Sequence, residues 1–319
     1  TTGIRTLEIK NLDDFKKLTL SKVNKTKVKS IDHNKEKWIK YFLNEEEIDL
    51  LRKVAAMKKV KSLSNYLDVD VGVVTGKNDF FIFDDTLARQ RKIKSYTKKV
   101  IARSNQLVGT TYDHKDFEKD LKEEKKVFLL DLQNSKKVES KSLLKYISFG
   151  ESLGVNEGYK CRIRKVWYKV PSTYNADIFC LRQAHLHPKL IENKIISTCT
   201  DTIHRGKIKG NVNAGKLCTA FINSMTFAYS EISGRSYGGG VMTFEPTEIE
   251  KLIIPNQDCW DNLDGAWADN EIRKGNIDSV LDYNDQLLLS EGLGLSKKEV
   301  NMLRMIWRKL RDRRLNRKR

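Results

Sequence analysis

Short apolar runs typical of β-strands begin at about residue 66 and recur as far as residue 221. Clusters of Gly, Asn, Asp and Ser separate them, and such clusters favour turns between regular elements. The pattern therefore predicts a β-rich body built from short strands. The predicted strands are residues 69–74, 80–83, 127–132, 162–170, 178–181, 195–200 and 219–221.

Helix signals stand on both sides of this stretch. Asn44 precedes three glutamates, so its side chain can cap a helix whose acidic first turn suits the positive end of the helix dipole. Thr247 and Glu250 have the spacing of a second capping box, just after Pro246. Ser296 with Glu299 starts a C-terminal helix. A preceding amphipathic helix is indicated by Ile277, Val280, Leu281, Leu287 and Leu288.

These signals predict an α+β fold, in which an irregular, curled β-rich body lies between an N-terminal helix and a C-terminal helical hairpin. Gly292 and Gly294 form the short turn of the hairpin. Three units are expected: a connector at residues 1–43 that leads from an upstream domain, a β-rich domain at 44–255, and the hairpin with its basic tail at 256–319.

The charge of the chain points to a polyanionic partner. Sixty Lys and Arg against forty-two Asp and Glu give a net charge of +18, which favours nucleic acid, although a merely soluble basic protein is the alternative. Residues 304–319 hold nine basic residues and one acidic residue, either as a phosphate grip or as a solvated, frayed tail. No apolar run reaches the length of a membrane span, so a membrane partner is not expected.

The cysteines do not indicate a metal site. No two of the five form a C-x-x-C pair, and the odd number fits a reducing cytosol rather than a disulfide framework. We expect a bacterial, cytoplasmic, nucleoid-associated protein without a bound metal.

Three segments carry a resemblance when they are taken in order. The first is residues 71–81 (VGVVTGKNDFF); the second is 164–171 (RKVWYKVP), continuing through 177–179 to 197–205 (STCTDTIHR); the third is 233–241 (SGRSYGGGV), followed by 245–252 (EPTEIEKL). Together they resemble the C-terminal specificity region of gamma-class N6-adenine DNA methyltransferases of type II restriction–modification systems, the TaqI-like specificity domain. The match runs from about residue 38 to the C-terminus and implies a target-recognition domain for double-stranded DNA.

The resemblance also implies a catalytic domain upstream, which would bind S-adenosylmethionine. Such a domain holds the flipped adenine with an Asn/Asp-Pro-Pro-aromatic loop. The four prolines of this chain are nowhere adjacent, and the Gly292-Leu293-Gly294 turn follows a predicted helix rather than a strand. We therefore expect no cofactor and no catalysis in this chain alone.

Eight polar residues of these segments are candidates for contact with DNA. An Asn can bond an adenine edge, and a Lys or Arg can bond guanine or phosphate. Several have a structural alternative: a turn that closes a hairpin at Asn78, an Arg164 lying over the core, a satisfied structural His204, or an Arg235 that fastens its loop to a carboxylate. The candidates are Thr75, Lys77, Asn78, Arg162, Arg164, Asp201, His204 and Arg235.

Two other functions fit parts of the sequence. Asp177 with Glu192 and Lys194 has the loose pattern of a metal-dependent restriction endonuclease, in which carboxylates bind magnesium and Lys polarises the reacting group. A stand-alone specificity subunit of a multi-subunit restriction system is the second. Such subunits often carry two recognition regions, whereas no internal repeat is apparent here.

Overall fold

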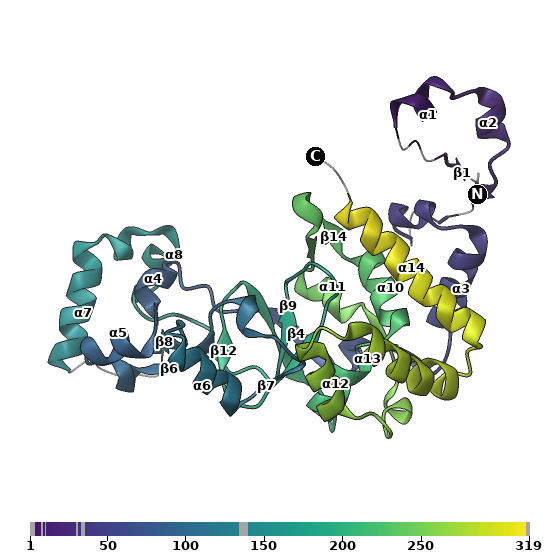
Figure 1. Ribbon diagram of the computed structural model, residues 1–319. Coiled ribbons are helices and arrows are strands. Elements are labelled where there is room, and N and C mark those ends of the chain that lie inside the picture. The colour runs from purple at the N-terminus through teal and green to yellow at the C-terminus, as the bar shows by residue number, and fades with distance from the viewer. Residues whose placement is uncertain are drawn as a thin grey trace.

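The computed structural model describes residues 4–7, 9, 11–29, 31–32, 36–133 and 140–316. Helices and strands alternate along the chain, and more of these residues lie in helices than in strands. Figure 1 shows one lobe around α4, α5, α7 and α8, a narrower middle, and a second lobe built around α10 and α14. The expected α+β class is confirmed.

Five sheets organise the described residues. The largest has the order β4 (Leu67–Val71), β13 (Ile203–Ile208), β9 (Ile178–Leu181), β11 (Leu190–Asn193) and β7 (Thr111–Tyr112). A four-stranded sheet has the order β12 (Thr198–Cys199), β6 (Thr97–Ile101), β8 (Phe128–Leu130) and β5 (Ile82–Phe83). The small sheets are β10 (Gln183–Ala184), β15 (Met242–Thr243) and β14 (Arg235–Ser236); β16 (Ile253–Pro255) with β3 (Val60–Ser62); and β1 (Ile4–Arg5) with β2 (Val28–Lys29).

The five-stranded sheet is covered on both faces, because it separates two hydrophobic cores. Successive side chains of a strand point to opposite faces. In β9, Ile178 and Cys180 enter one core, whereas Phe179 between them enters the other. A strand buried on both faces is apolar at every position, which explains why the run at 178–181 does not alternate.

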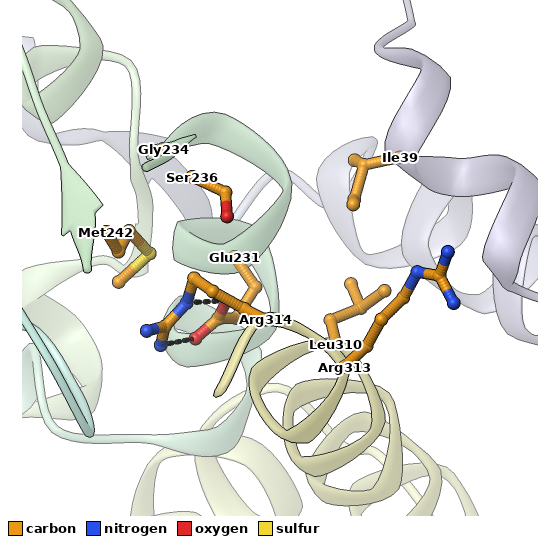
Figure 2. Close-up of a pocket in the computed structure, with 8 residues that line it drawn as sticks. All are labelled: Ile39, Glu231, Gly234, Ser236, Met242, Leu310, Arg313 and Arg314. Atoms are coloured by element: carbon orange, nitrogen blue, oxygen red, sulfur yellow. Dashed lines mark hydrogen bonds and ion pairs between the residues drawn. The ribbon is translucent and has the colours of Figure 1, made fainter. Parts of the chain in front are cut away.

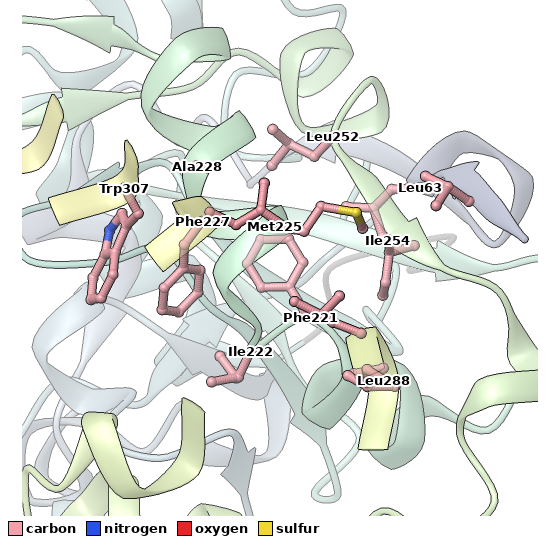
Figure 3. Close-up of a cluster of buried hydrophobic side chains, with 14 of the residues drawn as sticks. Leu63, Phe221, Ile222, Met225, Phe227, Ala228, Leu252, Ile254, Leu288 and Trp307 are labelled. Carbon is pink, nitrogen blue, oxygen red and sulfur yellow. The ribbon is translucent and has the colours of Figure 1, made fainter. Parts of the chain in front are cut away.

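One core, which we call the helical core, is built mainly from helices. It includes residues from 31 to 67 and from 178 to 310. Its helices are α3 (Glu45–Ala55), α9 (Ala214–Ala220), α10 (Ser224–Ser233), α11 (Pro246–Glu250), α12 (Gly265–Arg273), α13 (Ile277–Asn284), the π-helix η8 (Asp285–Gly292) and α14 (Lys297–Leu315). Figure 3 shows Met225 and Phe227 of α10 between Trp307 and Leu288, so α10 is enclosed by its neighbours.

The other core, which we call the distal core, lies between residues 73 and 203. Its helices are α4 (Asn78–Phe81), α5 (Asp85–Gln90), α6 (His114–Lys122), α7 (Lys141–Ser152) and α8 (Tyr159–Arg162). Two short helices, α1 (Leu12–Lys16) and α2 (Leu20–Asn24), lie near the N-terminus. The 3-10 turns are η1 (Trp38–Phe42), η2 (Leu63–Asn65), η3 (Lys94–Tyr96), η4 (Ser104–Gln106), η5 (Val155–Glu157), η6 (Gly238–Gly240) and η7 (Gln257–Cys259).

The helix caps follow the sequence at two of three places. Asn44 and Glu47 form the expected capping box of α3, with bonds of 2.7 and 2.8 Å, and Ser296 with Glu299 caps α14. The predicted box of Thr247 and Glu250 is wrong. Glu245 caps α11 instead, with Glu248 three residues on, because Pro246 needs no N–H partner at the first helical position.

Two predicted strands are wrong, and others are shorter or displaced. Residues 162–170 begin at the last residue of α8 and continue as turns, since Arg164 folds back onto neighbouring carbonyl groups. Residues 219–221 lie at the end of α9. The run at 80–83 starts in α4 and becomes extended at β5. The run at 178–181 is confirmed as β9; those at 69–74, 127–132 and 195–200 are confirmed in part as β4, β8 and β12.

The C-terminal helices run antiparallel, as expected. Arg304 pairs with Asp285 at 2.7 Å and also with Asp282, and Arg308 pairs with Asp278 at 2.7 Å, so rising numbers on α14 meet falling numbers on the preceding helix. However, α14 packs most extensively on α10. The helical core therefore contains residues from both sides of residue 255. The three units expected from the sequence remain a prediction.

The basic C-terminal segment is an ordered helix as far as Leu315. Arg314 is buried and binds Glu231 of α10 through two bonds of 2.7 and 2.9 Å (Figure 2). It also donates to the carbonyl groups of His185 and Gly240. The frayed-tail interpretation is wrong for the described part. Residues 317–319 lie outside the described residues.

None of the helices that the structure describes has the length and apolarity needed to cross a membrane.

Removing the Arg314 side chain tests how much this buried pair stabilises the fold. We expect Arg314→Ala to lower the free energy of unfolding by about 3–5 kcal/mol, because Glu231 is left buried without its partner. Arg308→Ala on the same helix breaks an exposed pair with Asp278 and should cost less than about 1 kcal/mol. Urea unfolding measures both, and equal losses would contradict the proposed anchoring of α14.

Candidate nucleic-acid interface

The loop between β4 and α4 is shaped by its own polar side chains. Thr75 is buried; its hydroxyl donates to the Asn78 side chain and accepts the Lys77 N–H at 3.2 Å. Gly76 has a φ of +87°, which a residue with a side chain rarely adopts. The turn therefore presents the side chains of Lys77 and Asn78 to solvent.

Helix α8 is fastened to this loop. Arg164 donates to the carbonyl groups of Val74 and Thr75 at 2.9 and 2.8 Å, and Cys161 of α8 is buried beside the same carbonyl of Thr75. A Cβ on Gly76 would lie 2.9 Å from that of Lys160, so the loop and the helix are in close contact. Arg162 projects from the end of α8 and is exposed.

The loop and α8 thus bring together five of the candidates: Thr75, Lys77, Asn78, Arg162 and Arg164. The structure also adds cations that the sequence did not indicate. Lys126 binds Asp79 at 2.8 Å and lowers the pKa of that carboxyl, and the charges of Lys77 and Arg103 act in the same direction. Residues that far apart in the sequence give no local pattern. We call the set Lys77, Arg103, Lys126, Lys160 and Arg162 the basic face.

Asp201 lies beside the start of the same loop. Its N–H donates to the carbonyl of Val73 at 3.2 Å, its carbonyl accepts from Arg182 at 3.3 Å, and its side chain is partly exposed. Arg182 lies 3.8 Å from Glu245, which caps α11. A short series of polar contacts therefore connects the loop with the lobe around α10 and α14, which we call the helical lobe.

His204 lies inside the protein, in β13. Its side chain is 0% exposed, and Nε2 lies 2.8 Å from the carbonyl oxygen of Phe244. Burial lowers the pKa of His204, so the ring is neutral at pH 7 and donates through Nε2. Nδ1 has no hydrogen-bond partner among the described residues. His204 thus connects two segments of backbone and has no surface for a ligand.

Arg235 is exposed on the other lobe, in β14. Its Nε donates to Glu248 of α11 at 3.0 Å, which is the carboxylate contact that the sequence left as an alternative. Arg235 lies outside the basic face, because Glu248 fastens it to the helical lobe.

The nuclease pattern does not form a metal site. Glu192 faces Ile178 across the sheet, whereas Asp177 pairs with Asn193 through its backbone, so the two carboxylates leave opposite faces. Asp177 accepts instead from Lys207 at 2.8 Å and from the Ile208 N–H at 3.0 Å. Within the described ranges, no three His, Cys, Asp or Glu side chains converge as metal ligands.

The glycine turn before α14 does not fit S-adenosylmethionine. A Cβ on Gly292 would lie 2.8 Å from the sulfur of Cys259, and Leu293 and Leu295 are buried. The turn also follows a π-helix, whereas a nucleotide-type loop follows a strand. The interpretation as a hairpin turn fits this packing.

The similar proteins are type II methyltransferases. The chain is 26% identical over 223 residues to the type II methyltransferase M.AccI of Acinetobacter calcoaceticus, covering 68% of the chain and 39% of that protein. It is 27% identical over 126 residues to M.XamI of Xanthomonas campestris pv. amaranthicola, covering 40% of the chain and 24% of that protein. The chain thus spans well under half the length of these relatives.

The fold is similar to part of a solved enzyme, the type IIG restriction endonuclease BpuSI. The TM-score is 0.52 at 13% identity, with 87% of this chain and 34% of that chain covered. At this identity the likeness concerns the fold alone. Residues 35–289 also match the family described as "Type II methyltransferase M.Eco57I, C-terminal domain", which is most of the chain. The chain therefore belongs to the family of type II methyltransferase C-terminal domains, as the sequence resemblance led us to expect.

Proposed function

We propose that this chain binds duplex DNA and helps to select the target sequence of a site-specific adenine-N6 DNA methyltransferase in a restriction–modification system. The observation that carries the proposal is the basic face. Lys77, Arg103, Lys160 and Arg162 come from three separate segments, and none forms a direct salt bridge among the described residues. Unpaired cations in one place attract a polyanion, and DNA is the polyanion on which this class of enzyme acts.

The side chains of the interface divide into two groups. Lys77, Asn78 and Arg162 are exposed and Asp201 is partly exposed, so these can reach phosphates or base edges. Thr75, Arg164 and His204 bind the protein's own polar groups, so we assign them to support of the loop and the sheet. Arg235 requires release from Glu248 before it can bind DNA.

Methyl transfer itself belongs, in this proposal, to sequence outside this chain. The relatives are more than twice as long as the segments that match. The Gly292–Gly294 turn is packed against Cys259 and does not fit S-adenosylmethionine. The catalytic domain would bind that cofactor and receive the flipped adenine, while this chain holds the duplex.

Salt dependence of DNA binding tests the basic face. Each phosphate contact contributes about 0.9 to the slope of log K against log salt, because a counterion is released. We expect Lys77→Ala and Arg162→Ala each to weaken binding to a mixed-sequence duplex and to reduce the slope by about 1. Fluorescence anisotropy over a salt series measures affinity and slope together.

Lys297→Ala is the matched control, since Lys297 is an exposed lysine at the start of α14, at the other end of the molecule (Figure 1). Its slope should equal that of the unchanged chain. Binding that does not depend on salt, or equal effects of all three substitutions, would reject the basic face as the DNA surface.

The arrangement of Asp177 and Glu192 gives a second test. Because they face opposite sides of the sheet, we expect no cleavage of plasmid DNA by the chain with magnesium or manganese. Gel electrophoresis detects a single cut. Metal-dependent cutting that disappears in Asp177→Ala would replace the recognition proposal with a nuclease.

A further inference from the structure

Two large apolar side chains stand in solvent within the basic face. Tyr159 is 65% exposed and Ile163 is 59% exposed, although each is large enough to be buried in a core. They are four residues apart, at the start of α8 and just after its end, and so share one side of this turn. We call this pair the α8 edge.

The opposite side of α8 holds the edge in place. Cys161, between the two apolar residues, is 1% exposed and lies against the carbonyl of Thr75. Arg164 comes directly after Ile163 and donates to three backbone carbonyl groups, those of Val74, Thr75 and Trp167. With its inner side fastened to the loop in this way, α8 cannot rotate to bury the α8 edge.

Several cations lie beside the α8 edge. The Lys160 ammonium lies 5.7 Å from the centre of the Tyr159 ring, and Arg162 and Lys165 are exposed on the same short segment. Lys77 is the next cation across the loop, since Gly76 contacts Lys160. Glu157 is the acidic residue nearest in sequence, two positions before Tyr159.

The exposed apolar side chains and the cations beside them indicate the chemistry of the partner that would bind the α8 edge. An exposed apolar pair with cations beside it fits a surface that has apolar groups between regularly spaced anions. Nucleic acid is such a surface, because its bases and deoxyriboses lie between phosphates. An ordinary protein surface offers fewer anions around an apolar patch. The charge complementarity therefore favours DNA over a protein partner.

We propose that the α8 edge is an apolar wedge that enters a groove of the duplex and contacts bases or deoxyriboses. Lys77, Lys160 and Arg162 would bind the flanking phosphates. This inference rests on the proposed function, and it adds which element touches the interior of the duplex. Apolar side chains inserted in this way partly unstack the neighbouring bases.

The wedge and the cations differ in their dependence on salt. Phosphate contacts release counterions and steepen the salt dependence, whereas an apolar contact changes affinity by the same factor at every salt concentration. A wedge variant should therefore shift the line of log K against log salt without changing its slope.

The experiment compares the unchanged chain with the double variant Tyr159→Ala/Ile163→Ala. Both side chains are exposed, so unfolding by urea should be unchanged. We expect affinity for a mixed-sequence duplex to fall about 5- to 150-fold with an unchanged salt slope. 2-Aminopurine placed along the duplex should brighten on binding of the unchanged chain and stay dim with the variant, because unstacking relieves its quenching.

Two further variants sharpen the result. Tyr159→Phe keeps the ring and should retain most of the affinity and the fluorescence change. Leu186→Ala removes another exposed apolar side chain, 56% exposed and belonging to the helical lobe, and should have no effect.

The outcomes separate the wedge from the proposed function. If the double variant binds and brightens the probe like the unchanged chain while Lys77→Ala and Arg162→Ala weaken binding, the wedge is wrong and DNA binding stands. A fall in both affinity and salt slope in the double variant also rejects it, since the edge would then only position the cations. If the unchanged chain fails to bind DNA, the proposed function itself is lost.

Discussion

The structure depends on one sheet that is buried on both of its faces. Strand β9 alternates between the two cores, with Ile178 and Cys180 on one side and Phe179 on the other, and β11 does the same with Leu190 and Ile191. Each core therefore fixes the sheet from its own side. The loop between β4 and α4 follows the end of β4, and the turn at Asp201 leads into β13 beside it. Both segments are therefore positioned by this sheet.

Guanidinium groups connect the sheet to the loops. Arg205 of β13 is 2% exposed; it binds Asp70 at 3.1 Å and the backbone of Val71 and Ser172, and it stacks on Tyr174 at 3.9 Å. Arg164 serves the loop at Val74 in the same way. A loop end has carbonyl groups without strand partners, and a guanidinium supplies several donors at once. Arg164 and Arg205 of the motif segments thus hold the backbone next to the proposed interface.

This division explains what the sequence could and could not predict. Patterns that lie within one segment were sufficient to predict the caps at Asn44 and Ser296 and the apolar run of β9. Residues 162–170 look extended, but Arg164 binds the carbonyl groups of Val74 and Thr75, about ninety residues away in the chain, and the segment folds back. Arg103 and Lys126 join the basic face through tertiary structure alone, and burial of His204 is likewise decided by Phe244.

Net charge indicates a binding surface only where basic side chains lack carboxylate partners. The C-terminal helix is the most basic segment, yet several of its cations are paired: Lys309 with Glu47, Arg308 with Asp278 and Arg314 with Glu231. These pairs fasten α14 to the rest of the protein and offset part of its charge. The basic face has fewer cations, but those without carboxylate partners act together on the solvent. In the proposed function, the surplus of +18 therefore acts through the basic face, rather than through the segment where basic residues are densest.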